Sequence, residues 1–181
     1  MLPARLSRRA AEDRYRDRRL AALQRAEEIA SAALAPVPVG LNLINLTALQ
    51  AFQDQWEGNP SRRYPWPWPQ MVEDAKKNEP DRFEVSVWSG ETLCGLAVGW
   101  TRQAFCRVDY LEGSPDPAHP LKGSVAVIVS GAATAYATAL GKDEIRLMNP
   151  IPAVVPHYQG LGFTVANLTD GTPYCSWKRV I

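Results

Sequence analysis

Phe83-Glu-Val-Ser-Val-Trp88 begins the stretch that decides the fold, because its residues alternate as they do in a half-buried strand. Ser89-Gly-Glu91 is a turn signal, and the largely apolar residues 92–102 follow it. Residues 105–111 form another strand-like run. Three consecutive strands joined by short turns predict an antiparallel meander.

The chain after this meander alternates between helix and strand signals. It predicts a helix, a strand, a short helix and two closing strands, over residues 121–140, 144–149, 153–160, 163–168 and 174–180. The long helix is rich in Ala and Val and is ended by Gly141. Small residues on all its sides favour a helix packed closely on a sheet.

The chain before the meander predicts one strand and two helices. Apolar residues alternate over residues 39–43, and helical spacing follows over residues 46–56 and 68–77. Between these helices lies Arg62-Arg-Tyr-Pro-Trp-Pro-Trp-Pro69. Alternating prolines fix φ and remove backbone donors, so this segment is predicted to be an extended loop.

The N-terminal region differs in charge from the rest of the chain. Residues 1–35 hold eight Arg and five acidic side chains, so their net charge is +3. Because the whole chain has a net charge of +1, the remaining residues have a net charge of −2. Residues 7–34 lack Gly and Pro and predict a long exposed helix, ended by Pro36 and Pro38. We expect a basic helical extension over residues 1–36 that docks on the domain or on a partner.

Composition indicates one globular unit in a reducing compartment. The 181 residues are 46% hydrophobic and 22% charged, enough apolar surface for a core. Cys94, Cys106 and Cys175 are widely spaced and form no CxxC pair, and no cluster has the spacing of a metal site. No apolar run resembles a signal peptide or a membrane span. We therefore expect a cytoplasmic protein without a metal or a membrane anchor.

The predicted order, β-α-α-β-β-β-α-β-α-β-β, resembles that of the GNAT (Gcn5-related N-acetyltransferase) family. The clearest local match is His157-Tyr-Gln-Gly-Leu-Gly-Phe163, which is similar to the family signature Y-x-x-L/x-G-F. Helix 121–140 also has the length of the family helix that binds CoA pyrophosphate. Over residues 37–181 the resemblance implies an α/β (α+β) acyltransferase domain, with a mixed, mostly antiparallel sheet of about seven strands flanked by helices.

The resemblance implies acetyl-CoA as acyl donor, with an altered phosphate loop. The family motif is Q/R-x-x-G-x-G/A, whose glycines let backbone N–H groups approach pyrophosphate. Leu121-Lys-Gly-Ser-Val-Ala126 aligns with it in one register, and a shift by one residue restores Gly123 but puts Pro120 first and Val125 last. The candidate phosphate-binding residues are Lys122, Gly123, Ser124, Val125 and Ala126.

Catalytic roles carry over from the same resemblance. The family often uses a carboxylate near its fourth strand to assist the amine, which corresponds to Asp109 or Glu112. Glu112 is preferred, because it lies at the strand's end and faces the loop that opens toward the cofactor. A backbone N–H near a bulge, around Tyr110 or Leu111, would bind the acyl oxygen. Tyr158 corresponds to the family tyrosine that protonates the departing thiolate. His119 and His157 receive no role.

The aromatic loop falls where the family builds its acceptor pocket. Tyr64, Trp66 and Trp68 are therefore candidate substrate-wall residues, since rigid aromatic surfaces bind at low entropic cost. Arg62 and Arg63 beside them suit an acidic acceptor or a nucleic acid.

These observations predict an enzyme that transfers acetyl from acetyl-CoA directly to a primary amine of a small molecule or peptide. Two alternatives stay open. One is a GNAT-fold binding or structural module without activity, and the other is a toxin that acetylates aminoacyl-tRNA. The resemblance also implies a homodimer.

Overall fold

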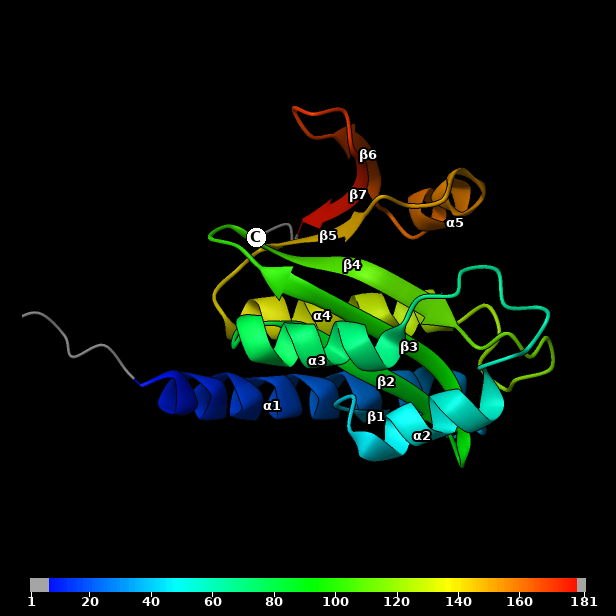
Figure 1. The fold of residues 1–181 in the computed structure, drawn as a ribbon. Coiled ribbons are helices and arrows are strands. Elements are labelled where there is room, and N and C mark those ends of the chain that lie inside the picture. The colour runs from blue at the N-terminus through cyan, green and yellow to red at the C-terminus, as the bar shows by residue number, and fades with distance from the viewer. Residues whose placement is uncertain (1–6, 179–181) are drawn as a thin grey trace, which may run out of the picture.

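A seven-stranded mixed sheet forms the centre of the computed structural model, which describes residues 7–178 (Figure 1). Its strands are β1 (Gly40–Asn42), β2 (Phe83–Ser89), β3 (Thr92–Thr101), β4 (Phe105–Gly113), β5 (Glu144–Met148), β6 (Thr164–Asn167) and β7 (Pro173–Lys178), in the order β1-β2-β3-β4-β5-β7-β6. Only the β4–β5 pairing is parallel in the described sheet. The predicted meander and the mixed, mostly antiparallel sheet are confirmed.

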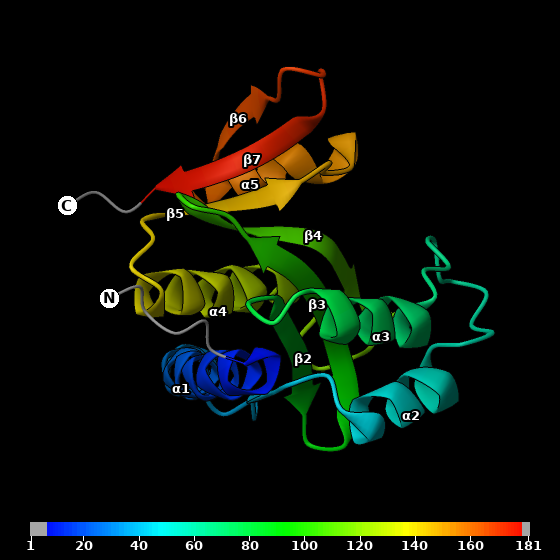
Figure 2. The same cartoon turned by 60° about the vertical axis from the view of Figure 1, so that its left-hand side comes forward.

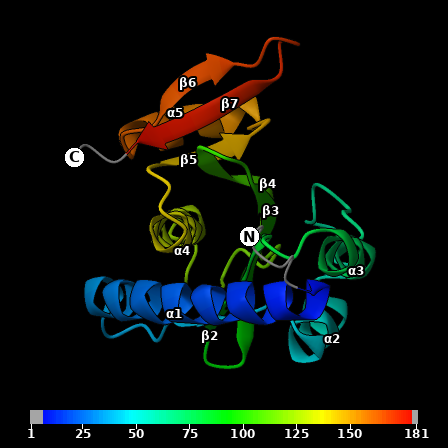
Figure 3. The same ribbon diagram turned by 90° about the vertical axis from the view of Figure 1, so that its left-hand side faces the viewer.

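Helices cover both faces of the sheet. They are α1 (Arg8–Leu34), α2 (Leu46–Gln55), α3 (Trp68–Asn78), α4 (Val125–Ala139) and α5 (Val155–Gly160), the last preceded by a 3-10 turn η1 (Pro152–Val154). Figures 2 and 3 show α1 and α4 side by side on one face of strands β2–β4, and α2 and α3 on the other. None of these helices combines the length and apolar character that crossing a membrane requires.

Each face of the sheet has its own apolar core. Val85, Cys106 and Val108 pack with the small side chains of α4 on one face. Trp56 and Trp68, both fully buried, pack on Leu96 and its neighbours on the other. The small residues of α4 let the helix approach the sheet closely, as its composition predicts.

Helix α1 belongs to the first of these cores. Its residues Ala22, Leu23 and Ala26 are buried against the α4 side of the sheet. Arg19 is 1% exposed and lies in an ionic cluster with Glu12, Arg82 and Glu84. The helix therefore docks on the domain. The division of the chain at residue 36 stays a prediction, and residues 1–6 and 179–181 lie outside the described residues.

Helix α4 begins later than its composition suggests. The prediction placed its start at residue 121, whereas residues 119–124 form turns in which Lys122 N–H bonds the His119 carbonyl and Ser124 N–H bonds that of Leu121. Gly123 has a φ of +81°, which an α-helix cannot accommodate. The helix therefore begins at Val125, directly after this turn.

A bulge in β4 positions the functional cleft. Val98 of β3 pairs with Tyr110 and Gly99 pairs with Val108, so Asp109 is an extra residue in β4. The parallel pairing with β5 also ends at Val108. Beyond it β4 continues with no strand on that side in the described sheet. The two strands therefore diverge at the bulge and leave a gap at the carboxyl ends of both.

Candidate active site

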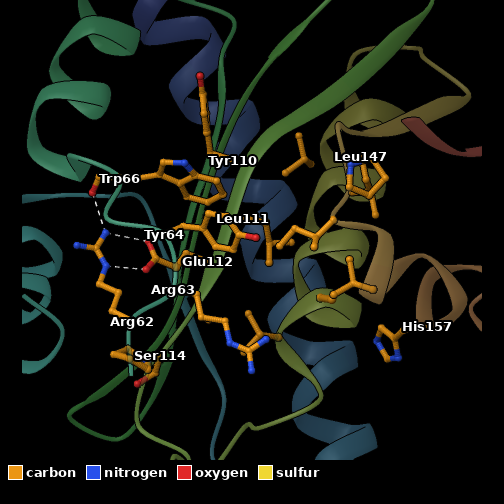
Figure 4. A pocket seen from close by; sticks show the side chains of 18 of the residues that line it. Arg62, Arg63, Tyr64, Trp66, Tyr110, Leu111, Glu112, Ser114, Leu147 and His157 are labelled. Atoms are coloured by element: carbon orange, nitrogen blue, oxygen red, sulfur yellow. Dashed lines mark hydrogen bonds and ion pairs between the residues drawn. The ribbon is translucent and has the colours of Figure 1, made fainter. Parts of the chain in front are cut away.

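A cleft of about 1020 Å³ opens where β4 and β5 diverge. Its walls are the α2–α3 loop, the second half of β4 with the loop after it, the start of α4, the end of β5, and α5 (Figure 4). Three separate stretches of the chain, residues 61–66, 108–126 and 147–158, meet here. Of the residues predicted from the sequence, all but Ser124 and Trp68 line this cleft.

The start of α4 presents unused backbone donors to the cleft. The N–H groups of Gly123, Val125 and Ala126, which line the cleft, bond no acceptor among residues 7–178. The Lys122 side chain is exposed beside them. Free N–H groups and the positive end of the helix dipole favour the binding of an anion such as a phosphate.

Gly95 on β3 explains how Val125 is tolerated at this helix start. A Cβ atom on Gly95 would lie 2.5 Å from Cγ1 of Val125. The Val125 side chain is thus directed at the sheet and is buried, occupying the space that Gly95 leaves. Its bulk consequently does not cover the free N–H groups.

Tyr158 lies on α5 and lines the cleft. Its ring is 8% exposed and packs against Phe163, with centroids 6.0 Å apart. Its hydroxyl makes no hydrogen bond with the part of the chain that the structure describes. Burial raises the pKa of Tyr158, and the Cys175 thiol contributes in the same direction. The hydroxyl therefore keeps its proton at neutral pH and is available as a donor.

Glu112 is held by three hydrogen bonds. Arg62 donates from Nε to Oε1 at 2.7 Å and from Nη2 to Oε2 at 3.0 Å, and Trp68 Nε1 donates to Oε2 at 2.6 Å. Arg62 also donates to the Trp66 carbonyl at 2.7 Å (Figure 4). Both carboxylate oxygens are thus occupied, and Glu112 joins β4 to the α2–α3 loop.

Asp109, the extra residue in the bulge, is also paired. Arg107 Nε donates to its Oδ2 at 2.9 Å, and Arg107 Nη2 bonds the other oxygen. Burial raises the pKa of Asp109, although Arg107, Arg102 and the Trp100 N–H favour the carboxylate. Asp109 is therefore a partly desolvated carboxylate at the edge of the cleft.

Aromatic rings form the wall beside the α2–α3 loop. Trp66 meets Tyr110 edge-on at 5.3 Å between centroids and stacks on Tyr64 at 5.8 Å. Tyr64 is 41% exposed, whereas Trp68 is fully buried behind the wall, where it binds Glu112. Trp68 thus supports the wall and does not reach the cleft.

His119 is a cleft residue to which sequence reasoning gave no role. It is 6% exposed, and its Nδ1 has no hydrogen-bond partner within residues 7–178. Burial lowers the pKa of His119. The Asp116 carboxylate raises this pKa, and the positive charge of Lys122 lowers it further. Its surrounding sequence, a proline-rich loop, carries no signal of burial. His157, by contrast, is an exposed residue of α5 that lines the cleft.

Solved structures similar to this chain include N-acetyltransferases and other acetyltransferases. PaiA N-acetyltransferase of Thermoplasma acidophilum in complex with coenzyme A has a TM-score of 0.53 and 13% identity, over 78% of this chain and 99% of that one. A spermidine N-acetyltransferase chimera of Vibrio cholerae SpeG and hSSAT has a TM-score of 0.57 and 16% identity, over 77% of this chain and 95% of that one. An acetyltransferase of Thermus thermophilus has a TM-score of 0.57 and 13% identity, over 78% of this chain and 97% of that one.

No protein-family model matches the sequence, and neither does any curated protein. At 11–16% identity the structural likeness establishes the fold. This chain has the GNAT fold, as its order of elements predicts.

Proposed function

We propose that this chain, which has the GNAT fold, is an N-acetyltransferase that moves an acetyl group from acetyl-CoA directly to a primary amine. The observation that carries the proposal is the set of free N–H groups at the start of α4, which open into the cleft beside the unpaired part of β4. This arrangement fits a donor with a diphosphate at one end and an acyl group at the other.

The residues of the cleft can divide the reaction among them. Gly123, Val125, Ala126 and Lys122 would hold the diphosphate, while backbone N–H groups of β4 near Tyr110 and Leu111 would bind the acyl oxygen. The amine nitrogen attacks the acyl carbon, the carbon–sulfur bond breaks, and the leaving sulfur takes a proton. That proton would come from the Tyr158 hydroxyl.

The amine must also lose a proton. Asp109 is the better placed of the two predicted carboxylates to accept it, directly or through water, because its side-chain partner Arg107 is 25% exposed and can turn toward solvent. Glu112 is instead held by Arg62, which is 9% exposed, and by the fully buried Trp68. Glu112 then serves as a positioning residue for the acceptor loop. In this scheme the acceptor enters from the aromatic side of the cleft, opposite α4.

Acetyl-CoA should bind with micromolar affinity in a calorimetric titration. Lys122→Glu places a negative charge beside the free N–H groups and should weaken binding by about tenfold, ~1.4 kcal/mol. Lys77→Glu is the matched control, because Lys77 is exposed on α3 and does not line the cleft. Absence of detectable binding at millimolar acetyl-CoA would replace this proposal with a binding module that lacks transferase activity.

Tyr158→Phe should lower kcat by roughly 100-fold, the lower end of what general-acid catalysis contributes, and leave acetyl-CoA binding unchanged. The substitution removes the proton donor but keeps the ring against Phe163. Steady-state kinetics and calorimetry measure the two effects. Tyr174→Phe is the control, since Tyr174 lies outside the cleft. An unchanged kcat would remove Tyr158 from the acid role.

A further inference from the structure

We propose that the acceptor is an aromatic or apolar primary amine that also carries a carboxylate, and that Arg63 binds this carboxylate. The inference rests on the proposed function and names the class of acceptor. It follows from which charges in the cleft are already paired and which remain unpaired.

Each of the two carboxylates on β4 neutralises an arginine, so neither attracts the additional positive charges of a polycationic acceptor. Glu112 and Arg62 have side chains 10% and 9% exposed and share two hydrogen bonds. Asp109 is 9% exposed and pairs with Arg107. Separating either pair would leave a charge without its partner in a partly dry site, which is costly. These acids therefore do not form an anionic site for a polyamine.

Arg63 differs from its neighbour Arg62. It is exposed and lines the cleft, and it has no hydrogen bond or ion pair with any described residue. Figure 4 shows Arg62 turned back toward Glu112, while Arg63 extends from the loop into the cleft. Adjacent arginines thus take separate roles. The guanidinium of Arg63 remains free to bind a carboxylate with two parallel hydrogen bonds.

The third carboxylate on the lining does not neutralise Arg63. Asp116 lies in the loop before α4, where its Oδ1 accepts the Ala118 N–H at 2.8 Å. It is exposed, so its charge is screened by water. Lys122 and the start of α4 add positive potential to the cleft. The cleft as a whole therefore favours an anionic group on the acceptor.

The wall next to Arg63 suits an apolar body. Tyr64 stacks on Trp66, and Trp66 rests edge-on against Tyr110, so the exposed Tyr64 ring is supported from behind. A flat ring of the acceptor can pack here with little loss of side-chain freedom. Arg63 and Tyr64 are consecutive, so the carboxylate and the ring would be held by one short segment.

The test compares acceptors that differ only in the carboxylate. Phenylalanine and phenethylamine are titrated into CoA-saturated protein and assayed for acetylation with acetyl-CoA, with spermidine as a polycationic comparison. Phenylalanine should bind and react at least about tenfold better than phenethylamine, because a charge-assisted pair is lost in the latter. Spermidine should be the poorest acceptor.

Arg63→Ala should reduce phenylalanine binding and kcat/KM by about tenfold and leave phenethylamine unaffected. Arg25→Ala is the control, because Arg25 is exposed on α1 outside the cleft. The inference would be overturned if Arg63→Ala lost activity equally with both acceptors, or if phenethylamine or spermidine were a better acceptor than phenylalanine. It would also be overturned if phenylalanine did not bind the CoA-saturated protein. A weakened affinity for acetyl-CoA in Arg63→Ala would overturn it as well, because Arg63 would then serve the donor phosphates. Failure to bind acetyl-CoA at all overturns the proposed function instead.

Discussion

Gly99→Ala should unfold the protein at urea concentrations that leave the unaltered chain native. A Cβ atom at residue 99 would lie 1.9 Å from the carbonyl oxygen of Arg107 and 2.9 Å from Cα of Val108. These are backbone atoms of the neighbouring strand, so no side-chain rotation can relieve the overlap. We expect a loss of at least ~3 kcal/mol, the upper range for overpacking, from a total stability of ~5–15 kcal/mol.

Gly131→Ala is the matched control for this substitution. Gly131 lies within α4, and a Cβ atom there meets nothing within 4 Å. Because alanine favours helices, this variant should gain ~0.5–1 kcal/mol in the same urea titration. A Gly99→Ala protein as stable as the unaltered chain would contradict the close approach of β3 to β4 and, with it, the bulge at Asp109 that opens the cleft.

Glu84→Gln should cost ~3–5 kcal/mol of unfolding free energy, the range for removing one partner of a buried ion pair. Glu84 is 1% exposed and lies 2.8 Å from the Arg82 guanidinium, and its Oε2 accepts the Ile44 N–H at 3.2 Å. The neutral glutamine side chain at position 84 would leave Arg82 and the buried Arg19 with only Glu12 as a negative partner among the described residues. Glu84 neutralises Arg82, whose guanidinium also donates to Glu12 of α1, so the substitution disturbs the cluster that joins α1 to the start of β2.

Glu28→Gln provides the comparison for the charge change alone. Glu28 is exposed on α1, where its carboxylate accepts a long hydrogen bond of 3.5 Å from Gln24. Its substitution should change stability by less than ~0.5 kcal/mol. Equal and small effects of the two substitutions in urea unfolding would show that the buried cluster does not stabilise the fold.

The order of elements was predictable from the sequence because it depends on local signals. Alternation within residues 83–111 and the turn at Gly90 determine the meander, whatever lies on either face of it. The predicted helix start at residue 121 was wrong, since the helix begins at Val125. Composition favours a helix there, but the positive φ of Gly123 and the turns before it exclude one.

The predicted site residues were brought to one place for the most part, yet their partners were not foreseeable. Glu112 and Arg62 are separated by 50 residues, and nothing in either segment signals their pairing. The same pairing occupies both oxygens of Glu112, a candidate base, and links it to the α2–α3 loop. Burial of Trp68 and His119 likewise depends on segments distant in the chain.

The sequence by itself determined which elements this chain forms, in which order, and that their order is that of the GNAT fold, because periodicity, turn residues and the Gly162-Phe163 signature act over a few residues. Tertiary structure alone decided which charges are paired. Ion pairing requires side chains within about 4 Å of each other. Only the folded sheet brings Arg62 to Glu112, while Arg63 lines the cleft without an ionic partner among the described residues.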